Sequence, residues 1–296
     1  MIDDPAAALE ILLEELRRQK SAGVRRVHLS DESMASLLAL AGKTPTTTPT
    51  TTPSPASKPS PTSKPSPATK PAVATPATAD APVFTLPAGT RSERMLALRQ
   101  LVDACSETRK HLTPPQRALL GHGSLEAQVV FVGEAPSLEE MEIGQAFAGA
   151  SGELLLRIIG AAGLVPADCY LVPVMGWRPE APTAYGKRPP TARELAFSRP
   201  YLRAQIAIVE PRIVVALGAQ AFEALHGRTP TITQARGQWF DLDGIPLLPT
   251  YHPNYLLHNP SATAKRAVWE DFLGLLAKLG RPISDKQRAY FAVGGG

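Results

Sequence analysis

Short apolar runs alternate with helical patterns in the C-terminal two thirds of the chain. Four runs are five or six residues long and rich in Val, Ile and Leu, and they span residues 128–132, 170–175, 213–217 and 247–251. Runs of this length and composition are typical of strands that are buried on both faces. Residues 241–244 (Asp-Leu-Asp-Gly) predict a hairpin turn before the last run.

Apolar residues recur at helical spacing between these runs. The predicted helices span residues 91–109, 151–162, 191–209, 219–225 and 263–279. The third begins with a capping box, in which Thr191 precedes Glu194 by three positions. Strands that alternate with helices predict an α/β domain with a parallel, doubly wound sheet. We place this domain at residues 83–280, followed by a tail over 281–296 that we expect to be frayed.

Two segments of different character precede the domain. Residues 1–42 predict two short helices and a strand, a unit too small to support much core of its own, so we expect it to dock on a protein partner. Residues 43–82 hold 11 of the chain's 30 prolines among Thr, Ser and Ala, without an aromatic residue. Such a composition cannot offset its chain entropy by burial, which predicts a disordered, polyproline-biased linker.

The net charge and the cysteine content exclude few classes of function. The net charge of +4 permits a nucleic-acid partner without requiring one, because the distribution of charge matters more than its total. The two cysteines, Cys105 and Cys169, allow one disulfide at most. The start of the chain does not resemble a secretory signal, and no apolar run reaches membrane-spanning length. We therefore expect a soluble, cytoplasmic protein with no membrane partner.

Candidate site residues follow the predicted strands. In an open parallel sheet, ligands bind beyond the carboxyl ends of the strands. Glu134 follows the first strand and His252 follows the fourth, so we expect both side chains on one rim. Each is weak evidence alone, because a Gly-Glu-Ala-Pro turn or a single histidine is more often structural. The absence of G-x-G-x-x-G and G-x-x-x-x-G-K motifs argues against a nucleotide-binding enzyme of another type.

Six stretches give this rim a more specific interpretation. They are VVFVGEAP (129–136), GQAFAGASGELL (144–155), RPYL (199–202), IVVALGAQAFEAL (213–225), RGQW (236–239) and LPTYHPNYLL (248–257). In this order they resemble the uracil-DNA glycosylase superfamily, most closely its family 4 type, from about residue 96 to residue 279. The resemblance implies a three-layer fold with a four-stranded, mainly parallel sheet between helical layers. It also implies a monomer that acts on DNA with deaminated bases.

The resemblance assigns roles in base excision. A glycosylase flips the nucleotide out and breaks the C1′–N bond, so negative charge builds on the departing base and needs hydrogen-bond donors. By similarity, His252 donates to the base O2 and Glu134 helps to place the attacking water. Backbone amides of the loop formed by Gly133, Glu134 and Ala135 approach the base.

Two residues further along carry both a family role and a plainer alternative. Glu140 matches a second functional acid, but it lies beside Glu139 and Glu142, where a solvated acidic face is an equal alternative. Phe147 matches the aromatic residue that stacks on the flipped base, and such stacking is worth about 1–3 kcal/mol. The alternative for Phe147 is a place in the core.

DNA contacts are expected from three segments. Asn254 and Tyr255 begin the segment 254–258, which matches the loop that enters the minor groove in the family. Ser151 stands at a helix start, where free amides could hold a phosphate or where the serine could cap the helix. Lys187 and Arg188 could contact the DNA backbone or form an exposed basic turn.

The chain departs from the family at its iron–sulfur cluster. Family 4 enzymes hold the cluster with four cysteines, of which only Cys105 is present here; the other positions carry Thr108, Trp177 and Ser198. One thiolate cannot hold a cluster that takes four, whereas Trp177 can fill the same volume with apolar bulk. We predict that the protein has no cluster and no other cofactor or metal.

A second departure concerns base selectivity. Family members that prefer uracil place an asparagine in the second strand, and the matching residue here is Pro173. Proline has no polar side chain and no N–H, and it fits a bulge or a strand end better than a strand interior. Losing hydrogen bonds to the base should weaken discrimination, which leaves uracil and other deaminated bases open as substrates.

Two functions remain as hypotheses. The first is a monofunctional DNA glycosylase, a hydrolase of N-glycosyl bonds for which the motifs place no lyase lysine. The second is a non-catalytic DNA-binding or damage-recognition protein with a degenerate site. Glu134, Phe147 and His252 together favour the enzyme, whereas Pro173 and the lost cluster ligands favour the binding protein.

Overall fold

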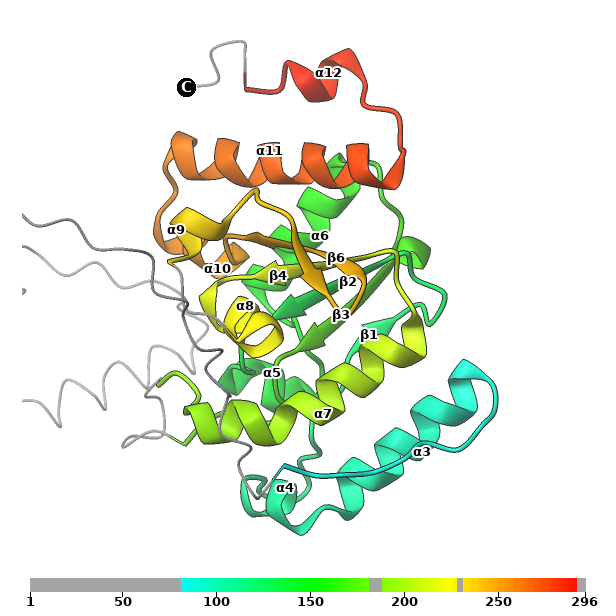
Figure 1. Cartoon of the computed structure of the whole chain (residues 1–296). Coiled ribbons are helices and arrows are strands. Elements are labelled where there is room, and N and C mark those ends of the chain that lie inside the picture. The colour runs from blue at the N-terminus through cyan, green and yellow to red at the C-terminus, as the bar shows by residue number, and fades with distance from the viewer. Residues whose placement is uncertain (1–80, 181–187, 228–230, 292–296) are drawn as a thin grey trace, which may run out of the picture. The chain divides into compact units, whose positions relative to one another are not determined.

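The computed structural model of the chain describes residues 81–180, 188–227 and 231–291. The predicted N-terminal module at 1–42 lies outside these ranges, as does the predicted linker up to residue 80. The described chain forms one six-stranded sheet with helices on both faces (Figure 1). Within the same ranges, no helix combines the length and the apolar character needed to cross a membrane.

The four strands predicted from the sequence form the centre of the sheet. They are β2 (Val129–Gly133), β3 (Cys169–Pro173), β4 (Ile213–Leu217) and β6 (Ile245–Thr250). Neighbours pair in parallel in the order β3-β2-β4-β6, so their carboxyl ends meet at one edge. Every residue of β2, β3 and β4 is buried, which explains their continuous apolar composition.

Two short antiparallel strands extend the sheet beyond the four that the sequence predicted. β1 (His122–Gly123) pairs with β3, and β5 (Phe240–Leu242) pairs with β6. β5 and β6 form the predicted hairpin, with Asp243 and Gly244 at positive φ in its turn. At two and three residues, β1 and β5 are too short to show an alternating pattern in the sequence.

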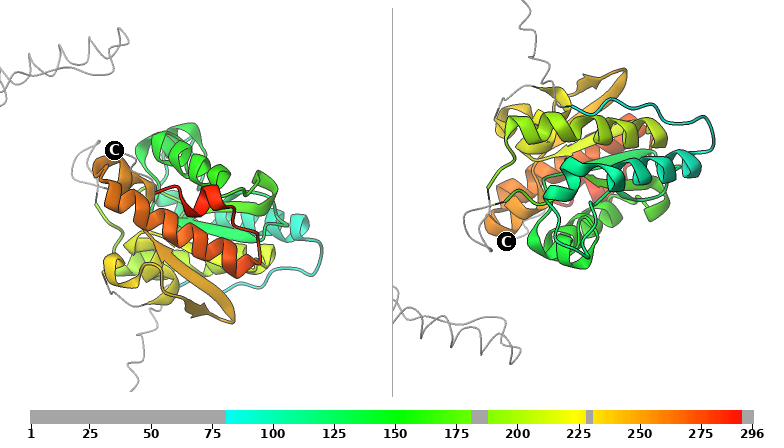
Figure 2. Two further views of the ribbon diagram at one scale, coloured as in Figure 1. Left: turned by 90° about the horizontal axis from the view of Figure 1, so that it is seen from above. Right: turned by 90° about the horizontal axis from the view of Figure 1, so that it is seen from below.

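Helices pack on both faces of this sheet. They are α3 (Arg91–Ala104), α4 (Ser106–Lys110), α5 (Leu138–Ile143), α6 (Ala150–Ala161), α7 (Ala192–Val209), α8 (Ala219–His226), α9 (Ile232–Ala235), α10 (Pro253–His258), α11 (Ala262–Leu279) and α12 (Asp285–Arg288). One core contains Leu155 of α6 and Leu275 of α11, and the other contains Ile206 of α7 and Phe222 of α8. Views from above and below show α11 and α7 on opposite sides of the sheet (Figure 2). The domain therefore has the three layers that the family resemblance implied.

Two expectations fail near the ends of the domain. The predicted helix over 91–109 is interrupted at Cys105, whose extended backbone (φ −67°, ψ 116°) ends α3 and precedes α4. The predicted frayed tail packs on α11 as far as residue 291. Trp269 Nε1 donates to the carbonyl oxygen of Gln287 at 2.8 Å, and the Tyr290 ring lies 5.2 Å from the Trp269 ring. A buried indole N–H needs an acceptor, and the tail supplies it.

Candidate active site

A cleft of about 520 Å³ opens at the carboxyl edge of the parallel strands. Most residues predicted from the sequence line it, namely Gly133, Glu134, Ala135, Glu140, Phe147, Ser151, Pro173, Arg188, His252 and Asn254. Tyr255 is not among the lining residues, and Lys187 lies outside the described residues. The parallel strands thus bring residues that are distant in the sequence together at the carboxyl edge of the sheet.

Glu134 and His252 approach each other beside the end of β4. Gly218, which follows β4, has a φ of 90°. A Cβ atom built on Gly218 would lie 2.9 Å from Glu134 Oε1 and 3.2 Å from His252 Cβ. The carboxylate and the histidine therefore flank the same backbone position. A side chain there would strain the backbone and displace one of them, so this turn requires glycine.

The hydrogen bonding of His252 identifies its donor nitrogen. His252 is the N-cap of α10, and its Nδ1 accepts the backbone N–H of Asn254 at 3.1 Å. A backbone amide can only donate, so Nδ1 carries no proton and the neutral ring holds its proton on Nε2. The amides of the helix N-terminus also disfavour a positive charge on the ring. His252 can therefore present an Nε2–H donor.

Phe147 links the core to the cleft. Its φ of 58° is uncommon for a residue other than glycine. The ring edge lies against Gly133, where a Cβ would come within 2.4 Å of Phe147 Cζ. The Phe147 and His252 rings have centroids 6.4 Å apart and planes inclined by 19°. Phe147 thus belongs to the buried core on one side and lines the cleft on the other.

Both carboxylate oxygens of Glu140 accept backbone N–H groups. Oε2 accepts from Ser137 at 2.7 Å and completes the capping box of α5, while Oε1 accepts from Phe147. Glu140 therefore fixes the loop between α5 and α6, including the unusual backbone of Phe147. These hydrogen bonds argue against a solvated acidic face, whereas the match to the family's second functional acid stays a prediction.

Pro173 brings no polar side chain to the end of β3 in the cleft. It is the last residue of β3, lies beside Gly133 of β2, and lines the cleft. The next amide, that of Val174, donates to the Gly133 carbonyl oxygen at 3.2 Å. At a strand end the missing N–H of proline interrupts no further pairing. The position offers neither a side-chain donor nor a side-chain acceptor.

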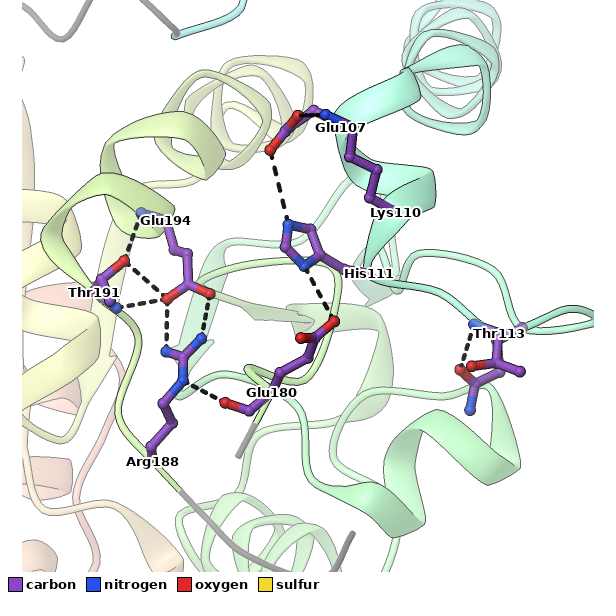
Figure 3. Close-up of polar contacts among 9 residues, drawn as sticks. Glu107, Lys110, His111, Thr113, Glu180, Arg188, Thr191 and Glu194 are labelled. Atoms are coloured by element: carbon purple, nitrogen blue, oxygen red, sulfur yellow. Dashed lines mark hydrogen bonds and ion pairs between the residues drawn. The ribbon is translucent and has the colours of Figure 1, made fainter. Parts of the chain in front are cut away.

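Arg188 lines the cleft with its charge already paired. Its guanidinium donates two hydrogen bonds of 2.7 Å to Glu194 and a further bond to the carbonyl oxygen of Glu180 (Figure 3). It also donates to the carbonyl oxygen of Pro189 at 3.0 Å. These hydrogen bonds from Arg188 hold the pKa of Glu194 at about 2. Because Glu194 also completes the capping box of Thr191, the ion pair fixes the start of α7 beside the cleft.

The other residues predicted to contact DNA lie near helix starts. Ser151 is in the first turn of α6, but the N-cap is Gly149, so Ser151 lines the cleft without capping the helix. Asn254 is in the first turn of α10. Tyr255 is exposed, and its ring lies 4.8 Å from that of Tyr251.

Several cleft residues received no role from the sequence. Among them are the polar residues Arg178 and Gln220, which come shortly after β3 and β4. Gln220 Oε1 is buried and has no hydrogen-bond partner among the described residues. The position of Gln220 directly after a parallel strand was the available signal.

Trp177 stands at a position where the family has a cysteine ligand of the iron–sulfur cluster. Trp177 is 2% exposed, and its ring is stacked on that of His111, with centroids 4.8 Å apart and planes inclined by 4°. Phe197 meets the Trp177 ring edge-on at 5.9 Å. His111 lies between the carboxylates of Glu107 and Glu180, at 4.0 and 3.9 Å (Figure 3). Aromatic packing therefore occupies this part of the fold.

The residues at the cluster positions do not fit an iron–sulfur cluster. A void of only about 20 Å³ remains beside Thr108, Trp177 and Ser198. Trp177 Nε1 and Ser198 Oγ are buried and have no hydrogen-bond partner within the described part of the chain. Cys105 is the one thiol of the set, and a cubane takes four. In the described ranges, no group of three or more His, Cys, Asp or Glu residues could hold a metal ion.

Comparison with known proteins decides the family. The model of the uracil DNA glycosylase superfamily matches residues 120–273, just over half of the chain. The chain belongs to this superfamily. All residues that line the cleft lie within the matched region.

Relatives in the uracil DNA glycosylase superfamily cover the same domain. A type-4 uracil-DNA glycosylase of Thermotoga maritima is 38% identical over 62% of this chain and 93% of its own length. Type-4 uracil-DNA glycosylases of Saccharolobus solfataricus and Sulfurisphaera tokodaii are 31% and 34% identical, over 53% and 52% of this chain. These matches span 74% and 71% of their own lengths. The resemblance to family 4 noted in the sequence is therefore confirmed.

Proposed function

We propose that the protein is a monofunctional DNA glycosylase that hydrolyses the N-glycosidic bond of uracil or another deaminated base. One observation carries the proposal: an Nε2–H donor on His252 and the Glu134 carboxylate flank the same turn in the cleft. Relatives that bear the name type-4 uracil-DNA glycosylase support the substrate class.

In the proposed reaction, the flipped nucleotide loses its C1′–N bond and the electron pair stays with the base. For uracil the resulting charge is shared with O2, where His252 Nε2–H donates a hydrogen bond. A single preorganised donor of this kind is worth about 10²–10³ in rate. Because the His252 ring is neutral, it stabilises the charge without transferring a proton first.

A water molecule completes the proposed hydrolysis. The Glu134 carboxylate accepts a hydrogen bond from this water and directs its oxygen to C1′, where the new C–O bond forms. The proton lost by the water leaves through Glu134, and the departed base anion takes up a proton in solution. The products are an abasic site and a free base.

The cleft supports a monofunctional enzyme with broad base choice. No lysine lines the cleft among the described residues, and a lyase step needs an amine nucleophile. Phe147 offers a stacking surface that every base can use. Because Pro173 cannot read the base edge, we expect uracil, hypoxanthine and xanthine to be discriminated less sharply than in a site that hydrogen-bonds one of them.

The test uses labelled oligonucleotides that contain uracil, hypoxanthine or xanthine, single-stranded or mispaired. After incubation with purified protein, alkali converts abasic sites into strand breaks. We expect breaks with the wild type, and a loss of about 10²-fold or more in His252→Ala and Glu134→Ala. His226→Ala is the matched control, because His226 ends α8 at the end remote from Gly218. Equal rates in His252→Ala and His226→Ala would exclude the proposed donor.

A non-catalytic DNA-binding or damage-recognition protein is the second candidate. Pro173 favours it, because the position that the family resemblance assigns to base reading has no polar side chain here. The same oligonucleotides distinguish the two candidates. Binding without release of any base would support this second function and reject the first.

We further propose that the domain folds and acts without an iron–sulfur cluster. The buried Trp177 and the single thiol at the four positions support this proposal. Iron and acid-labile sulfide should be absent from protein purified without oxygen, as measured by elemental analysis and a colorimetric sulfide assay. About four irons per chain, with a brown chromophore, would refute it.

The cellular setting belongs to the same proposal. We expect the protein to act as a monomer on DNA in the cytoplasm, and residues 1–42 to bind a protein partner. Sedimentation of the full chain, and comparison of its partners with those of a chain lacking residues 1–42, would test both expectations.

A further inference from the structure

A buried carboxylate contacts the end of β6, the strand that His252 follows. Asp271 of α11 is 4% exposed. Its Oδ2 accepts the Thr250 hydroxyl at 2.6 Å, and Arg236 donates to Oδ2 at 3.1 Å and to Oδ1 at 2.7 Å. Thr250 is fully buried at the end of β6, two residues before His252. The three side chains form one polar network inside the domain.

This network contacts the Gly218 backbone and the ring of Tyr251, the residue before His252. The Thr250 carbonyl oxygen accepts the N–H of Gly218 at 2.8 Å, and Gly218 is the turn that Glu134 and His252 flank. The Arg236 guanidinium lies 5.6 Å from the centre of the Tyr251 ring, next to His252. Thr250 therefore joins the Asp271 carboxylate to the Gly218 turn, which Glu134 and His252 flank.

The loop that carries Arg236 is built against the same carboxylate. Gly237 has a φ of 74°, and a Cβ on it would lie 2.9 Å from Asp271 Oδ1. The Gly237 N–H donates to the Pro249 carbonyl oxygen at 3.1 Å, and Arg236 also donates to the Ala267 carbonyl oxygen. These contacts hold the loop, β6 and α11 in one arrangement around Asp271.

The charge of Asp271 depends on pH near neutrality. Burial raises the pKa of Asp271 to about 6. The negative charge of Glu270 also raises this pKa, whereas the hydrogen bonds from Thr250 and Arg236 lower it. Arg236 pairs with the ionised carboxylate. The complete network therefore exists above about pH 6 and loses its ion pair as the pH falls through that value.

We propose that Asp271, acting through Thr250 and Arg236, is a positioning residue that sets the orientation of His252 and of the Gly218 turn. The inference rests on the proposed function, because it gives these two elements a catalytic use. A displacement of about 1 Å at such a site can cost 10²-fold in rate. The network thus gives a use to a buried carboxylate that does not line the cleft.

The experiment compares Asp271→Asn with Glu270→Gln, an exposed carboxylate next to it on α11. We expect kcat for excision to fall about 10- to 100-fold in Asp271→Asn, with KM within about threefold, and to stay near wild type in Glu270→Gln. In the wild type, kcat should fall as the pH drops through about 6. In Asp271→Asn this acidic limb should disappear. An unchanged kcat and an unchanged pH profile in a folded Asp271→Asn variant would overturn the inference.

Thr250 supplies a second pair of variants, which covers the case that Asp271→Asn does not fold. Thr250→Ser keeps the hydroxyl that Asp271 accepts, whereas Thr250→Val keeps the shape and removes it. We expect near-wild-type kcat in the first variant and the loss in the second. Equal kcat values in the two would contradict the proposed link.

A readout that needs no activity separates this inference from the proposed function. The ¹⁵N shifts of the His252 imidazole report which nitrogen carries the proton. The wild type should show the Nε2–H form, and Thr250→Val should show a mixture of tautomers or exchange broadening. If the wild type excises no base, the proposed function fails, and these shifts alone decide the positioning role. Identical shifts in both proteins would reject that role.

Discussion

Glu140 and Phe147 are linked by a hydrogen bond that fixes the aromatic wall of the cleft. The Glu140 carboxylate accepts the backbone N–H of Phe147, whose φ of 58° is unfavourable for a phenylalanine. The other carboxylate oxygen accepts the Ser137 N–H. Glu140, one of several acidic residues in this part of the sequence, thus fixes the loop that places the Phe147 ring in the cleft wall.

Glu140→Gln tests this link. Glutamine keeps one acceptor oxygen and turns the other into a donor, so one backbone N–H loses its partner. We expect a loss of about 1–3 kcal/mol in the free energy of unfolding, measured with urea, together with weaker binding of DNA that contains a flipped base. The control is Glu142→Gln, because Glu142 is exposed on the same helix. Equal stability of the two variants would show that the hydrogen bonds of Glu140 contribute little.

Gly218→Ala tests the turn between Glu134 and His252. The added Cβ would lie 2.9 Å from Glu134 Oε1 on a backbone with φ 90°. We expect a destabilisation of about 1–3 kcal/mol and a fall in excision rate of at least about tenfold. Gly160→Ala in α6 is the matched control, because a Cβ atom added at Gly160 would have nothing within 4 Å. A Gly218→Ala variant with wild-type rate would show that the turn tolerates a side chain.

The raised pKa of Asp271 should make the free energy of unfolding depend on pH. Its pKa rises from 3.8 in the unfolded chain to about 6 in the folded protein, so the folded state binds more protons between these values. This contribution to stability is fully present below about pH 4 and is lost as the pH rises through 6. The unfolding free energy of the wild type minus that of Asp271→Asn should fall by about 2–3 kcal/mol from pH 4 to pH 7. Parallel stability curves for the two proteins would contradict the raised pKa.

Glu194 should change the pH dependence of stability in the opposite direction to Asp271, and at lower pH. Its pKa is depressed to about 2 by hydrogen bonds from Arg188, so its contribution is present above about pH 4.5 and is lost as the pH falls towards 2. Glu194→Gln should therefore flatten the acid side of the stability curve below pH 4.5. An acid limb as steep as that of the wild type would show that other carboxylates dominate acid unfolding.

Trp177→Ala tests whether aromatic packing supports the fold at the cluster position. Removing a fully buried indole should cost about 3–5 kcal/mol, measured by chemical unfolding. Trp239→Ala is the matched control, because Trp239 is 37% exposed. An iron chelator should leave the unfolding midpoint of the wild type unchanged. Equal effects of the two substitutions would show that the packing around Trp177 contributes little.

The central strands and the gathering of site residues could be predicted from the sequence, because both follow from local patterns. Continuous apolar runs identify parallel strands, and the carboxyl ends of such strands lie at one edge. Thr191 and Glu194, three positions apart, similarly indicated the start of α7. The same spacing joins Ser137 and Glu140, so the capping role of Glu140 was also visible in the sequence.

Other features depend on contacts between distant residues, which no local pattern contains. Arg236, Thr250 and Asp271 meet only because α9, β6 and α11 pack together. The tail docks through Gln287 on Trp269, and no local pattern in the tail indicated that contact with a residue of α11. The break at Cys105 replaces one predicted helix by two, although its residue type does not stop a helix.

Release of a free base by the wild-type protein is the most direct test of glycosylase activity. Oligonucleotides that contain uracil, hypoxanthine or xanthine are incubated with the full chain, and the small-molecule fraction is analysed by mass spectrometry. We predict free base in amounts equal to the abasic sites formed, and none from His252→Ala in the same time. Intact DNA with no free base from any substrate, despite measurable binding, would show that the protein is not a glycosylase.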